Sequence, residues 1–230
     1  MVKHEFLREY LPATKLFSPD MLWRYVEDYE KVMLKPSGGG GGAGIIQLTD
    51  KGNDRYLVHA GSTKRVVEGR EKTVSYVKSL FRPKQYLLQP LISLGRIDGR
   101  PFDVRVMVQR SGKKSPWTVT GWVAKLAGPG YVVTNVARSR GKVLPLHTAI
   151  RLSNVEASDD LLDEIRHVTL EAADTLGKAY PTLREVGFDL GIDIEGKPWI
   201  IEANFRPSLS LFRKLKDQTF YKQIIAMRKK

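Results

Sequence analysis

Hydrophobic and polar residues alternate along four segments that follow residue 99, and this period of two predicts β-strands. The segments are residues 100–110 (RPFDVRVMVQR), 117–127 (WTVTGWVAKLA), 185–193 (EVGFDLGID) and 198–205 (PWIIEANF). In the first segment every second residue from Phe102 to Val108 is apolar, and Asp103 and Arg105 lie on the opposite face. We expect the first two segments to pair as antiparallel strands across the intervening SGKKSP.

The rest of the chain combines short strands with helices. Apolar residues recur at helical spacing in residues 19–29 (PDMLWRYVEDY), and further helices are expected over residues 69–81, over residues 158–178 and at the basic C-terminal end. Ser158 is the expected N-cap of the third helix, whose first turn is acidic. Short strands are expected over residues 31–36, 43–49, 55–61, 64–67 and 85–92. The fold class is therefore α+β with mostly antiparallel sheets.

Five consecutive glycines, residues 38–42, separate two of these expected strands. A slack linker, a short turn and a flap whose backbone approaches phosphates are the alternatives. The residues upstream are too few for an independent domain, which disfavours the linker. No lysine followed by Ser or Thr comes after the glycines, and the segment that follows resembles a strand, so Walker and Rossmann loops are excluded. A flap between strands is favoured, with Lys35 at its base as a charge for phosphate.

The strands over residues 185–193 and 198–205 predict a hairpin that gathers polar side chains on one face. If Glu195 and Gly196 form a two-residue turn, Asp189 lies directly opposite Glu202, and Asn204 is one diagonal step away. Strict alternation places Ile200 on the same face as Glu202. The glycines at positions 187 and 191 are expected to keep this face open.

Asp189, Glu202 and Asn204 offer carboxylate and amide oxygens, which suit magnesium or manganese. No histidine falls within the motif, which disfavours zinc. The alternative is a salt-bridged hairpin in which Glu202 meets a lysine. The metal is favoured, because a charge on an apolar strand usually has a partner or a ligand. Asp193 is expected to serve the turn.

Arg105 carries a second charge on an otherwise apolar strand. One interpretation is a structural ion pair with Asp103. The other, which we favour, is a rigid guanidinium presented to a phosphate or to a developing oxyanion.

Charge and composition narrow the function classes. The net charge is +13, and residues 51–150 carry 19 basic and 5 acidic side chains. Such an excess attracts nucleotides, nucleic acid or acidic peptides, although a solvated basic surface is the alternative. There is no cysteine, which excludes disulfides, a thiolate zinc site and a cysteine nucleophile. No apolar run is long enough to span a bilayer or to form a signal core, so we expect no membrane partner and a cytoplasmic location.

Taken in order, these motifs resemble the ATP-grasp superfamily, and within it the YheC/YheD endospore coat-associated family. In this resemblance Lys3 corresponds to the first nucleotide lysine. Lys35 corresponds to the second, and Gly40 and Gly41 belong to its nucleotide-binding flap. The strand YLLQPLI resembles the hinge that holds adenine, near Gln89 and Leu91. The segment VVTNVARSRG resembles the loop that carries Asn135, although relatives often have a double glycine there.

The resemblance implies an ATP- and magnesium-dependent ligase (manganese being the alternative metal), which joins a carboxylate to an amine through an acylphosphate. Asp189, Glu202 and Asn204 would hold the metal. Arg105 would stabilise the transferring phosphoryl group. Arg206 is the candidate for binding the donor carboxylate, with a bond to the turn before Pro207 as an equal alternative.

The resemblance further implies two subdomains whose antiparallel sheets clamp a nucleotide, with a glycine-flap part over residues 15–92 and a metal-binding part over residues 93–230. We expect no separate domain before them, so that recognition of a small-molecule or peptide acceptor is reduced or supplied by a protein partner. The positive charge favours an acidic acceptor.

Three rival functions stay open. They are a non-catalytic nucleotide-binding or spore-coat protein, a small-molecule kinase on the same fold, and a nucleic-acid binder. The nucleic-acid binder ranks last, because few aromatic residues accompany the basic segment. The expected location is the cytoplasm, and the resemblance implies that the protein could also associate with the spore.

Overall fold

The protein is described by a computed structural model that covers residues 1, 3–38, 42–131, 134 and 140–230. It divides into two compact units. The larger unit comprises Met1–Leu11, Ser93–Leu126 and Gly141–Lys230, and the smaller unit comprises Pro12–Ile92 and Ala127–Arg140. Each unit has a six-stranded sheet in which neighbouring strands pair antiparallel. The predicted α+β class with antiparallel sheets is confirmed.

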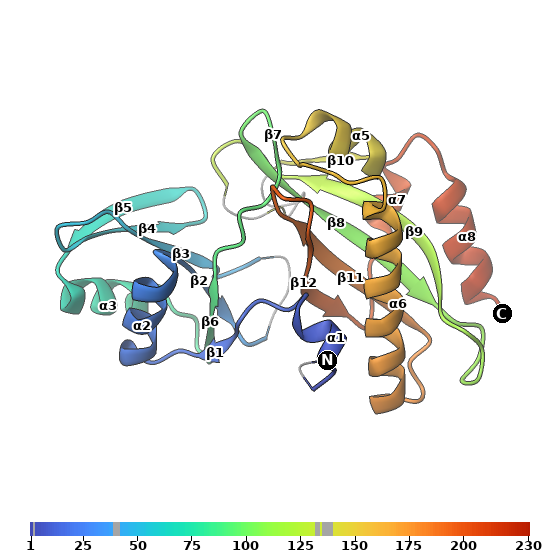
Figure 1. The fold of residues 1–230 in the computed structure, drawn as a ribbon, viewed down its shortest axis with the longest axis horizontal. Coiled ribbons are helices and arrows are strands. Elements are labelled where there is room, and N and C mark those ends of the chain that lie inside the picture. The colour runs from blue at the N-terminus through green and yellow to red at the C-terminus, as the bar shows by residue number, and fades with distance from the viewer. Residues whose placement is uncertain (2, 39–41, 132–133, 135–139) are drawn as a thin grey trace. The chain divides into compact units, whose positions relative to one another are not determined.

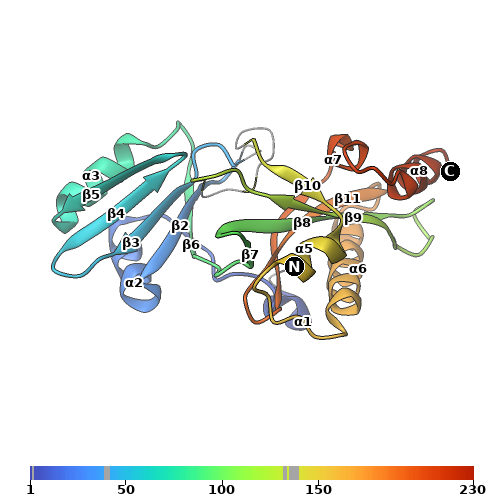
Figure 2. The ribbon, with the colours of Figure 1, turned by 90° about the horizontal axis from the view of Figure 1, so that it is seen from above.

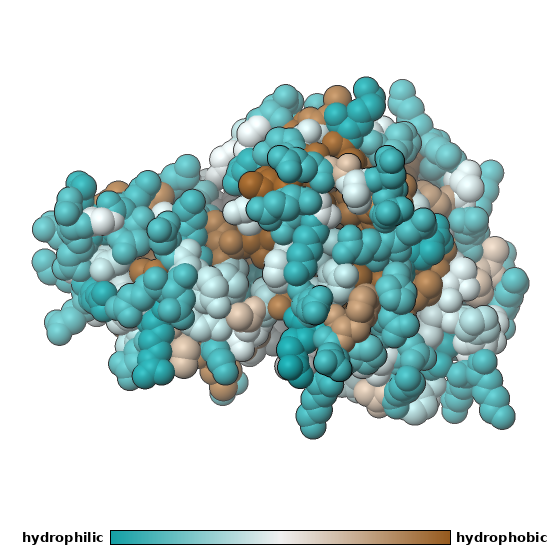
Figure 3. All heavy atoms as spheres, in the orientation of Figure 1, coloured by the Kyte–Doolittle hydropathy of each residue, from teal (hydrophilic) through white to brown (hydrophobic). Residues whose placement is uncertain are grey.

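The sheet of the smaller unit has the strand order β1-β6-β2-β3-β4-β5. Its elements are β1 (Lys15–Leu16), α2 (Pro19–Tyr29), β2 (Lys31–Pro36), β3 (Ile46–Asp50), β4 (Arg55–Ala60), β5 (Thr63–Glu68), α3 (Arg70–Ser79) and β6 (Tyr86–Pro90). Both helices lie on the same face of this sheet (Figure 1). Their apolar residues join the alternate residues of the strands in one buried core that includes Val26, Leu34 and Leu88. The outer faces of α2 and α3 are mostly hydrophilic (Figure 3).

The helix α2 has the predicted bounds, and its two ends show why. The Ser18 hydroxyl accepts a hydrogen bond from the backbone N–H of Met21 at 3.1 Å, which satisfies one of the unpaired donors of the first turn. Pro19 follows at the first helical position, where its missing N–H costs nothing. Ser18 and Pro19 therefore define where the helix begins.

The glycine-rich segment connects neighbouring strands of a single sheet, since β2 pairs directly with β3 and Leu34 lies opposite Ile46. The pattern of strands predicts this arrangement, and the linker interpretation is wrong. Gly44, at the end of the segment, has a φ of +80°. A Cβ there would lie 2.9 Å from the Tyr86 hydroxyl and 3.2 Å from a Pro36 ring carbon, so only glycine fits.

The sheet of the larger unit has the order β10-β9-β8-β11-β12, and the short β7 pairs with β8. Its strands are β7 (Arg96–Ile97), β8 (Arg100–Gln109), β9 (Thr118–Leu126), β10 (Lys142–Leu144), β11 (Glu185–Ile192) and β12 (Pro198–Asn204). Its helices are α1 (Glu5–Arg8), α5 (Leu146–Leu152), α6 (Leu161–Ala179), α7 (Ser210–Arg213) and α8 (Thr219–Arg228). Seen from above, α6 lies on one side of the sheet and α7 and α8 on the other (Figure 2).

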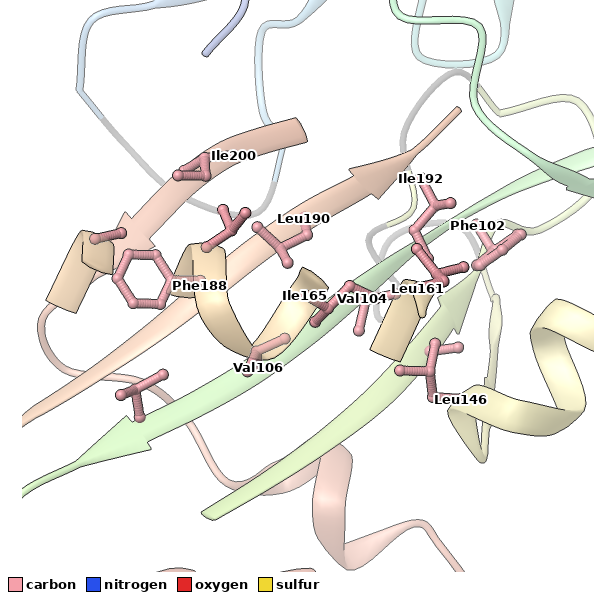
Figure 4. Close-up of a cluster of buried hydrophobic side chains, with 14 of the residues drawn as sticks. Phe102, Val104, Val106, Leu146, Leu161, Ile165, Phe188, Leu190, Ile192 and Ile200 are labelled. Atoms are coloured by element: carbon pink, nitrogen blue, oxygen red, sulfur yellow. The ribbon is translucent and has the colours of Figure 1, made fainter. Parts of the chain in front are cut away.

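The strict alternation along β8 and β11 explains this layering. Val104, Val106, Phe188 and Leu190 are fully buried in one core together with Ile165 of α6 (Figure 4). Burial of each such side chain contributes roughly 1.5–3 kcal/mol. The alternate residues face the other way, where apolar side chains such as Met107 and Val123 form a second core with Phe212 of α7, Ile224 of α8 and Leu215 between the two helices. The part of this second face that α7 and α8 do not fill carries charges.

The start of α6 differs from the expectation. The helix begins at Leu161, with Asp160 rather than Ser158 at its N-cap, and no side chain caps it. The backbone N–H of Leu161 bonds to the carbonyl oxygen of Ser158, so the preceding residues form a turn before the helix. The acidic first turn, with Asp163 and Glu164, is confirmed. None of the helices formed by the described residues is long and apolar enough to cross a membrane.

Candidate functional site: a charged cluster on the sheet of the larger unit

Three neighbouring strands of the larger unit place four charged side chains on one face of the sheet. Antiparallel pairing sets Arg105 of β8 opposite Asp189 of β11, and Asp103 of β8 opposite Lys125 of β9. This face is opposite to the one that packs on α6, because side chains alternate along a strand. All four side chains are buried. Below, the charged cluster means Asp103, Arg105, Lys125 and Asp189.

Asp189 lies at the centre of the charged cluster. The Arg105 guanidinium donates two parallel hydrogen bonds to the Asp189 carboxylate, from Nε to Oδ1 at 2.7 Å and from a terminal nitrogen to Oδ2 at 2.8 Å. The Lys125 ammonium donates a third, to Oδ1 at 2.8 Å, and lies 3.0 Å from a carboxylate oxygen of Asp103. Two buried cations therefore balance two buried carboxylates.

The pKa shifts of Asp189, Lys125 and Arg105 all favour the charged form of these three groups. Burial by itself would raise the pKa of Asp189, but attraction by Lys125 and hydrogen bonds from Arg105 outweigh it, so the pKa is lowered. Burial would lower the pKa of Lys125, yet the nearby Asp103 and Asp189 carboxylates raise it. The pKa of Arg105 is likewise raised against burial by Asp189 and, more weakly, by Asp103 and Glu202.

The strand β12 adds the other two residues of the predicted metal motif. Glu202 lies directly opposite Asp189, and Asn204 lies opposite Gly187, so the predicted register is confirmed at this end of the hairpin. The Asn204 amide nitrogen lies 3.3 Å from the Gly187 carbonyl oxygen and 3.5 Å from Asp189 Oδ2. Glu202 is exposed. The structure therefore brings Asp189, Glu202 and Asn204 together on one face beside Arg105.

The turn of this hairpin differs from the prediction. The Asp193 N–H bonds to the Lys197 carbonyl, so the loop has three residues, 194–196, and Gly196 has a φ of +89°. A bulge between Asp189 and Leu190 offsets the extra loop residue and restores the predicted pairing of Asp189 with Glu202.

The bulge also corrects the predicted face of Ile200, which lies opposite Leu190 and is buried in the core on the α6 side. Asp193 serves the turn, as expected. Its carboxylate accepts hydrogen bonds from the Lys197 N–H at 2.8 Å and from the Trp199 indole at 2.7 Å.

The two glycines on this face do not keep it open, contrary to expectation. A Cβ at Gly187 would lie 2.6 Å from the Pro207 Cβ and 3.3 Å from the Arg105 Cδ. A Cβ at Gly191 would lie 2.5 Å from a Leu94 methyl group. Both glycines instead allow neighbouring side chains to approach the backbone, and Gly187 gives Arg105 the space to lie along the strand.

Two of the three predicted metal ligands have oxygens that suit a hard divalent cation, and the third is already engaged. Glu202 and Asn204 contribute carboxylate and amide oxygens, whereas both oxygens of Asp189 already receive hydrogen bonds from cations. Over the described parts of the chain, no three His, Cys, Asp or Glu residues converge as they would around a metal. The assignment of Asp189, Glu202 and Asn204 as metal ligands stays a prediction.

For Arg105 the ion-pair alternative is present, but its partner is Asp189 rather than Asp103. The expected partner, Asp103, pairs with Lys125 instead. Lys125 is the residue that sequence reasoning missed. The signal was available, because Lys125 is the only charged residue between Thr118 and Leu126 of an otherwise apolar or neutral strand.

Lys35, at the base of the glycine segment, belongs to the smaller unit. So do Gln89 and Leu91, which are expected to lie near the nucleotide base. Lys35 on β2 and Gln89 on β6 project from the face of the sheet that α2 and α3 leave uncovered. The Gln89 side-chain amide donates a hydrogen bond to the Thr14 hydroxyl at 2.8 Å, and the Leu91 backbone N–H bonds to the Lys31 carbonyl. Their role stays a prediction.

Two further predicted residues lie in the larger unit. Lys3 and Arg206 are exposed there, and within the described part of the chain Arg206 forms no ion pair. Arg206 follows Asn204, the last residue of β12, by two positions.

Three of the predicted nucleotide-binding residues lie outside the described part of the chain. They are Gly40 and Gly41 of the glycine run and Asn135. The nucleotide contacts of Gly40, Gly41 and Asn135 stay predictions from the resemblance.

Comparison with known proteins agrees with this architecture. A family model described as YheC/D-like ATP-grasp matches residues 1–228. The chain belongs to this YheC/D-like ATP-grasp family. It is 28% identical over 215 residues to the endospore coat-associated protein YheD of Bacillus subtilis, covering 88% of the chain and 45% of YheD. It is 25% identical over 211 residues to YheC of the same organism, covering 89% of the chain and 57% of YheC. The chain thus spans about half the length of these two relatives.

Solved structures of ATP-grasp ligases share the fold. The ATP-grasp ligase PsnB, complexed with a minimal precursor, Mg and ADP, has a TM-score of 0.52 at 16% identity, over 97% of this chain and 56% of PsnB. The D-cycloserine synthetase DcsG has a TM-score of 0.55 at 16% identity, over 97% of this chain and 68% of DcsG. At this level of identity the likeness shows the fold alone, and activity has to be argued from the site.

Proposed function

We propose that this YheC/D-like ATP-grasp chain is an ATP- and magnesium-dependent ligase that joins a carboxylate to an amine through an acylphosphate. One observation carries the proposal. In a chain of the ATP-grasp family, Arg105 is held rigidly by Asp189 on the same face as Glu202 and Asn204. A preorganised cation beside oxygen donors is what charge stabilisation during phosphoryl transfer needs.

Arg105 has the geometry for this role. Two of its five N–H groups donate to Asp189, and no hydrogen bond from the other three to a described residue is seen, so they could bind a phosphate oxygen or an oxyanion. The Asp189 contact fixes the plane of the guanidinium, and Lys125 keeps Asp189 ionised. Asp189 and Lys125 would therefore act as positioning residues for Arg105, whether or not they contact the phosphate themselves.

Glu202 and Asn204 would hold the divalent cation, with Asp189 as the third candidate ligand. A magnesium ion bound there would neutralise charge on a polyphosphate. Arg206 would bind the donor carboxylate through a bidentate contact.

The nucleotide would be bound through its phosphates by two lysines and through its base by residues of β6 and the residue that follows it. Lys3 and Lys35 would contact phosphate oxygens as point charges, and Gln89 and Leu91 would lie near the base. We include Gly40, Gly41 and Asn135 in this proposal on the family resemblance alone.

The acceptor follows from charge and from the named relatives. The net charge of +13 favours an acidic small molecule or peptide, because like charges would repel a cationic one. The PsnB structures contain a precursor peptide, which makes a peptide acceptor a reasonable first choice for this chain. We further propose an association with the spore coat, since both curated relatives are named for it.

The test measures ADP and inorganic phosphate released from ATP and Mg²⁺ by the purified chain, with panels of acids and amines added singly and together. A ligase releases both products only when an acid and an amine are present. A kinase would release ADP without phosphate and transfer the phosphoryl group to one acceptor. Nucleotide binding without turnover for any pair would favour the non-catalytic alternative and overturn the proposal.

A further inference from the structure

A cavity of about 470 Å³ lies in the smaller unit, where β1 and β6 meet the C-terminal end of α3. Its walls include three aromatic rings, Phe17, Phe81 and Tyr86, and two lysines, Lys78 and Lys84. We propose that this cavity is a binding site for an organic anion with a flat apolar body, of the class of aromatic carboxylates. The inference is independent of the ligase proposal.

The three aromatic rings of the cavity pack against one another. The rings of Phe81 and Tyr86 are stacked, with centroids 3.8 Å apart and planes 6° from parallel. Phe17 meets Phe81 edge-on at 4.9 Å, and its backbone N–H bonds to the Tyr86 carbonyl. Such a wall suits a planar ring, because aromatic pairs prefer stacked and edge-to-face contacts.

Tyr86 is almost fully buried, so its ring supports the Phe81 ring rather than offering a free face of its own. The Tyr86 hydroxyl accepts a hydrogen bond from the Arg82 N–H at 3.2 Å, and the tyrosine residue as a whole is 2% exposed. Charged donors at the cavity come instead from Lys78 and Lys84.

The charges at the cavity are all of one sign. Lys78 lies in the last turn of α3, and Lys84 lies in the loop that leads to β6. Lys84 donates one hydrogen bond to the Gly38 carbonyl at 2.9 Å, and an ammonium group has two further donors. No acidic side chain is found among the described residues that line the cavity. Two ammonium groups beside an aromatic wall favour a ligand with one acidic group.

This cavity is distinct from the predicted nucleotide site. Tyr86 lies opposite Pro36 on the face of the sheet that packs on α2 and α3. Lys35 and Gln89 project from the other face, because neighbouring residues on a strand alternate. Tyr86 therefore faces away from Lys35 and Gln89, whereas Leu16, which also lines the cavity, lies opposite Leu87 on their side of the sheet.

The test uses three probes that separate the ring from the charge. 1-Naphthoate has both, 1-naphthalenemethanol has the ring alone, and acetate has the charge alone. Titration of the ¹⁵N-labelled full chain, followed by amide chemical shifts, should show that naphthoate binds at least about 5-fold more tightly than either other probe. The shifted amides should cluster at residues 16–17 and 78–86.

A charge variant and its control make the result specific. Lys78→Gln with Lys84→Gln should weaken naphthoate binding about 3- to 10-fold, because exposed ionic contacts are individually weak. The same variant should leave naphthalenemethanol binding unchanged. Lys51→Gln with Lys72→Gln removes the same charge from exposed positions of the smaller unit outside the cavity. It should leave naphthoate binding as in the unmodified chain.

A second experiment distinguishes two sources of an aromatic carboxylate, a peptide C-terminus and a small metabolite. Acetyl-Gly-Gly-Phe with a free C-terminal carboxylate is compared with its C-terminal amide and with naphthoate. Tighter binding of the peptide acid assigns the site to a peptide terminus, and tighter binding of naphthoate assigns it to a small metabolite. The inference is wrong if acetate binds as well as naphthoate, if the control pair weakens binding equally, or if the shifted amides lie elsewhere.

Discussion

The Arg105 guanidinium donates two parallel hydrogen bonds, of 2.7 and 2.8 Å, to the Asp189 carboxylate across the β8–β11 pair. Such fork-to-fork contacts are the strongest form of charged hydrogen bond and leave little freedom in the plane of the guanidinium. Lys125 joins the same carboxylate from β9. A single acidic residue therefore organises two cations from two neighbouring strands.

Asp189→Asn should destabilise the larger unit. The substitution keeps the shape of the side chain but leaves Arg105 and Lys125 buried without its charge. Loss of one partner from a buried ion pair costs about 3–5 kcal/mol. Urea unfolding should show this as a lower midpoint. Asp163→Asn, in the exposed pair with Arg166, should change the free energy of unfolding by about 1 kcal/mol or less. Equal effects of the two substitutions would contradict the central role of Asp189.

The stability contributed by Asp189 should depend on acidic pH. The folded protein lowers the pKa of Asp189 below that of the unfolded chain. A group with a depressed pKa stabilises the fold above its unfolded pKa of about 3.9, and this stability is lost as the pH falls toward the folded value. Urea midpoints of the unmodified chain and Asp189→Asn should therefore differ most near neutral pH and converge below about pH 4. A difference that stays constant down to about pH 2 would show that Asp189 does not titrate as inferred.

Gly187→Ala tests whether the glycine provides space for Arg105. An added Cβ would lie 2.6 Å from Pro207 and 3.3 Å from Arg105, so one of them has to move. Overpacking of this kind costs about 1–3 kcal/mol. Gly112→Ala is the matched control, since its Cβ would meet only a Ser115 hydroxyl, at 3.4 Å, and should change stability little. Similar unfolding midpoints for the two variants would show that the Gly187 contacts relax without cost.

Local patterns predict most of the strands and the longer helices, because each carries its own periodicity. The bounds of α2 follow from Ser18 and Pro19, and the apolar face of β8 follows from strict alternation. The strands β1 and β7 have two residues each, too few to show a period of two, and they form through their partners on β6 and β8.

The site shows a different limit. The pairing of Asp189 with Glu202 is predicted correctly, but the loop has one residue more than expected and the bulge removes the shift. Neither the loop length nor the bulge has a strong signal in the local sequence. Both depend on how β11 and β12 pack in the complete sheet. The contact between Arg105 and Asp189 joins strands that are 84 positions apart, so the identity of the partner depends on strand order rather than on local pattern.

Ser18→Ala and Ser158→Ala compare a serine that caps a helix with one that does not. Ser18 accepts the Met21 N–H, so its loss should cost about 1 kcal/mol. Ser158 lies three residues before the start of α6 and contributes only its backbone carbonyl there, which alanine retains. Chemical unfolding should detect the first change and find the second near zero. A loss at Ser158 as large as that at Ser18 would contradict the observed start of α6.

Glu202→Gln is the sharpest test of the proposed metal site. Glu202 is exposed and lies opposite Asp189, so its carboxylate can bind a cation without supporting the core. Calorimetric titration of ADP should show that Mg²⁺ increases the affinity of the unmodified chain. The variant should lose at least about tenfold of that increase, or about 1.4 kcal/mol. Its urea midpoint should stay as in the unmodified chain.

The control for this experiment is Glu195→Gln, which removes an exposed carboxylate from the loop of the same hairpin and should keep the magnesium effect. The two variants have equal net charge, so a difference between them reports the position of the carboxylate rather than the overall field. If Glu202→Gln keeps the full magnesium effect, Glu202 is no metal ligand.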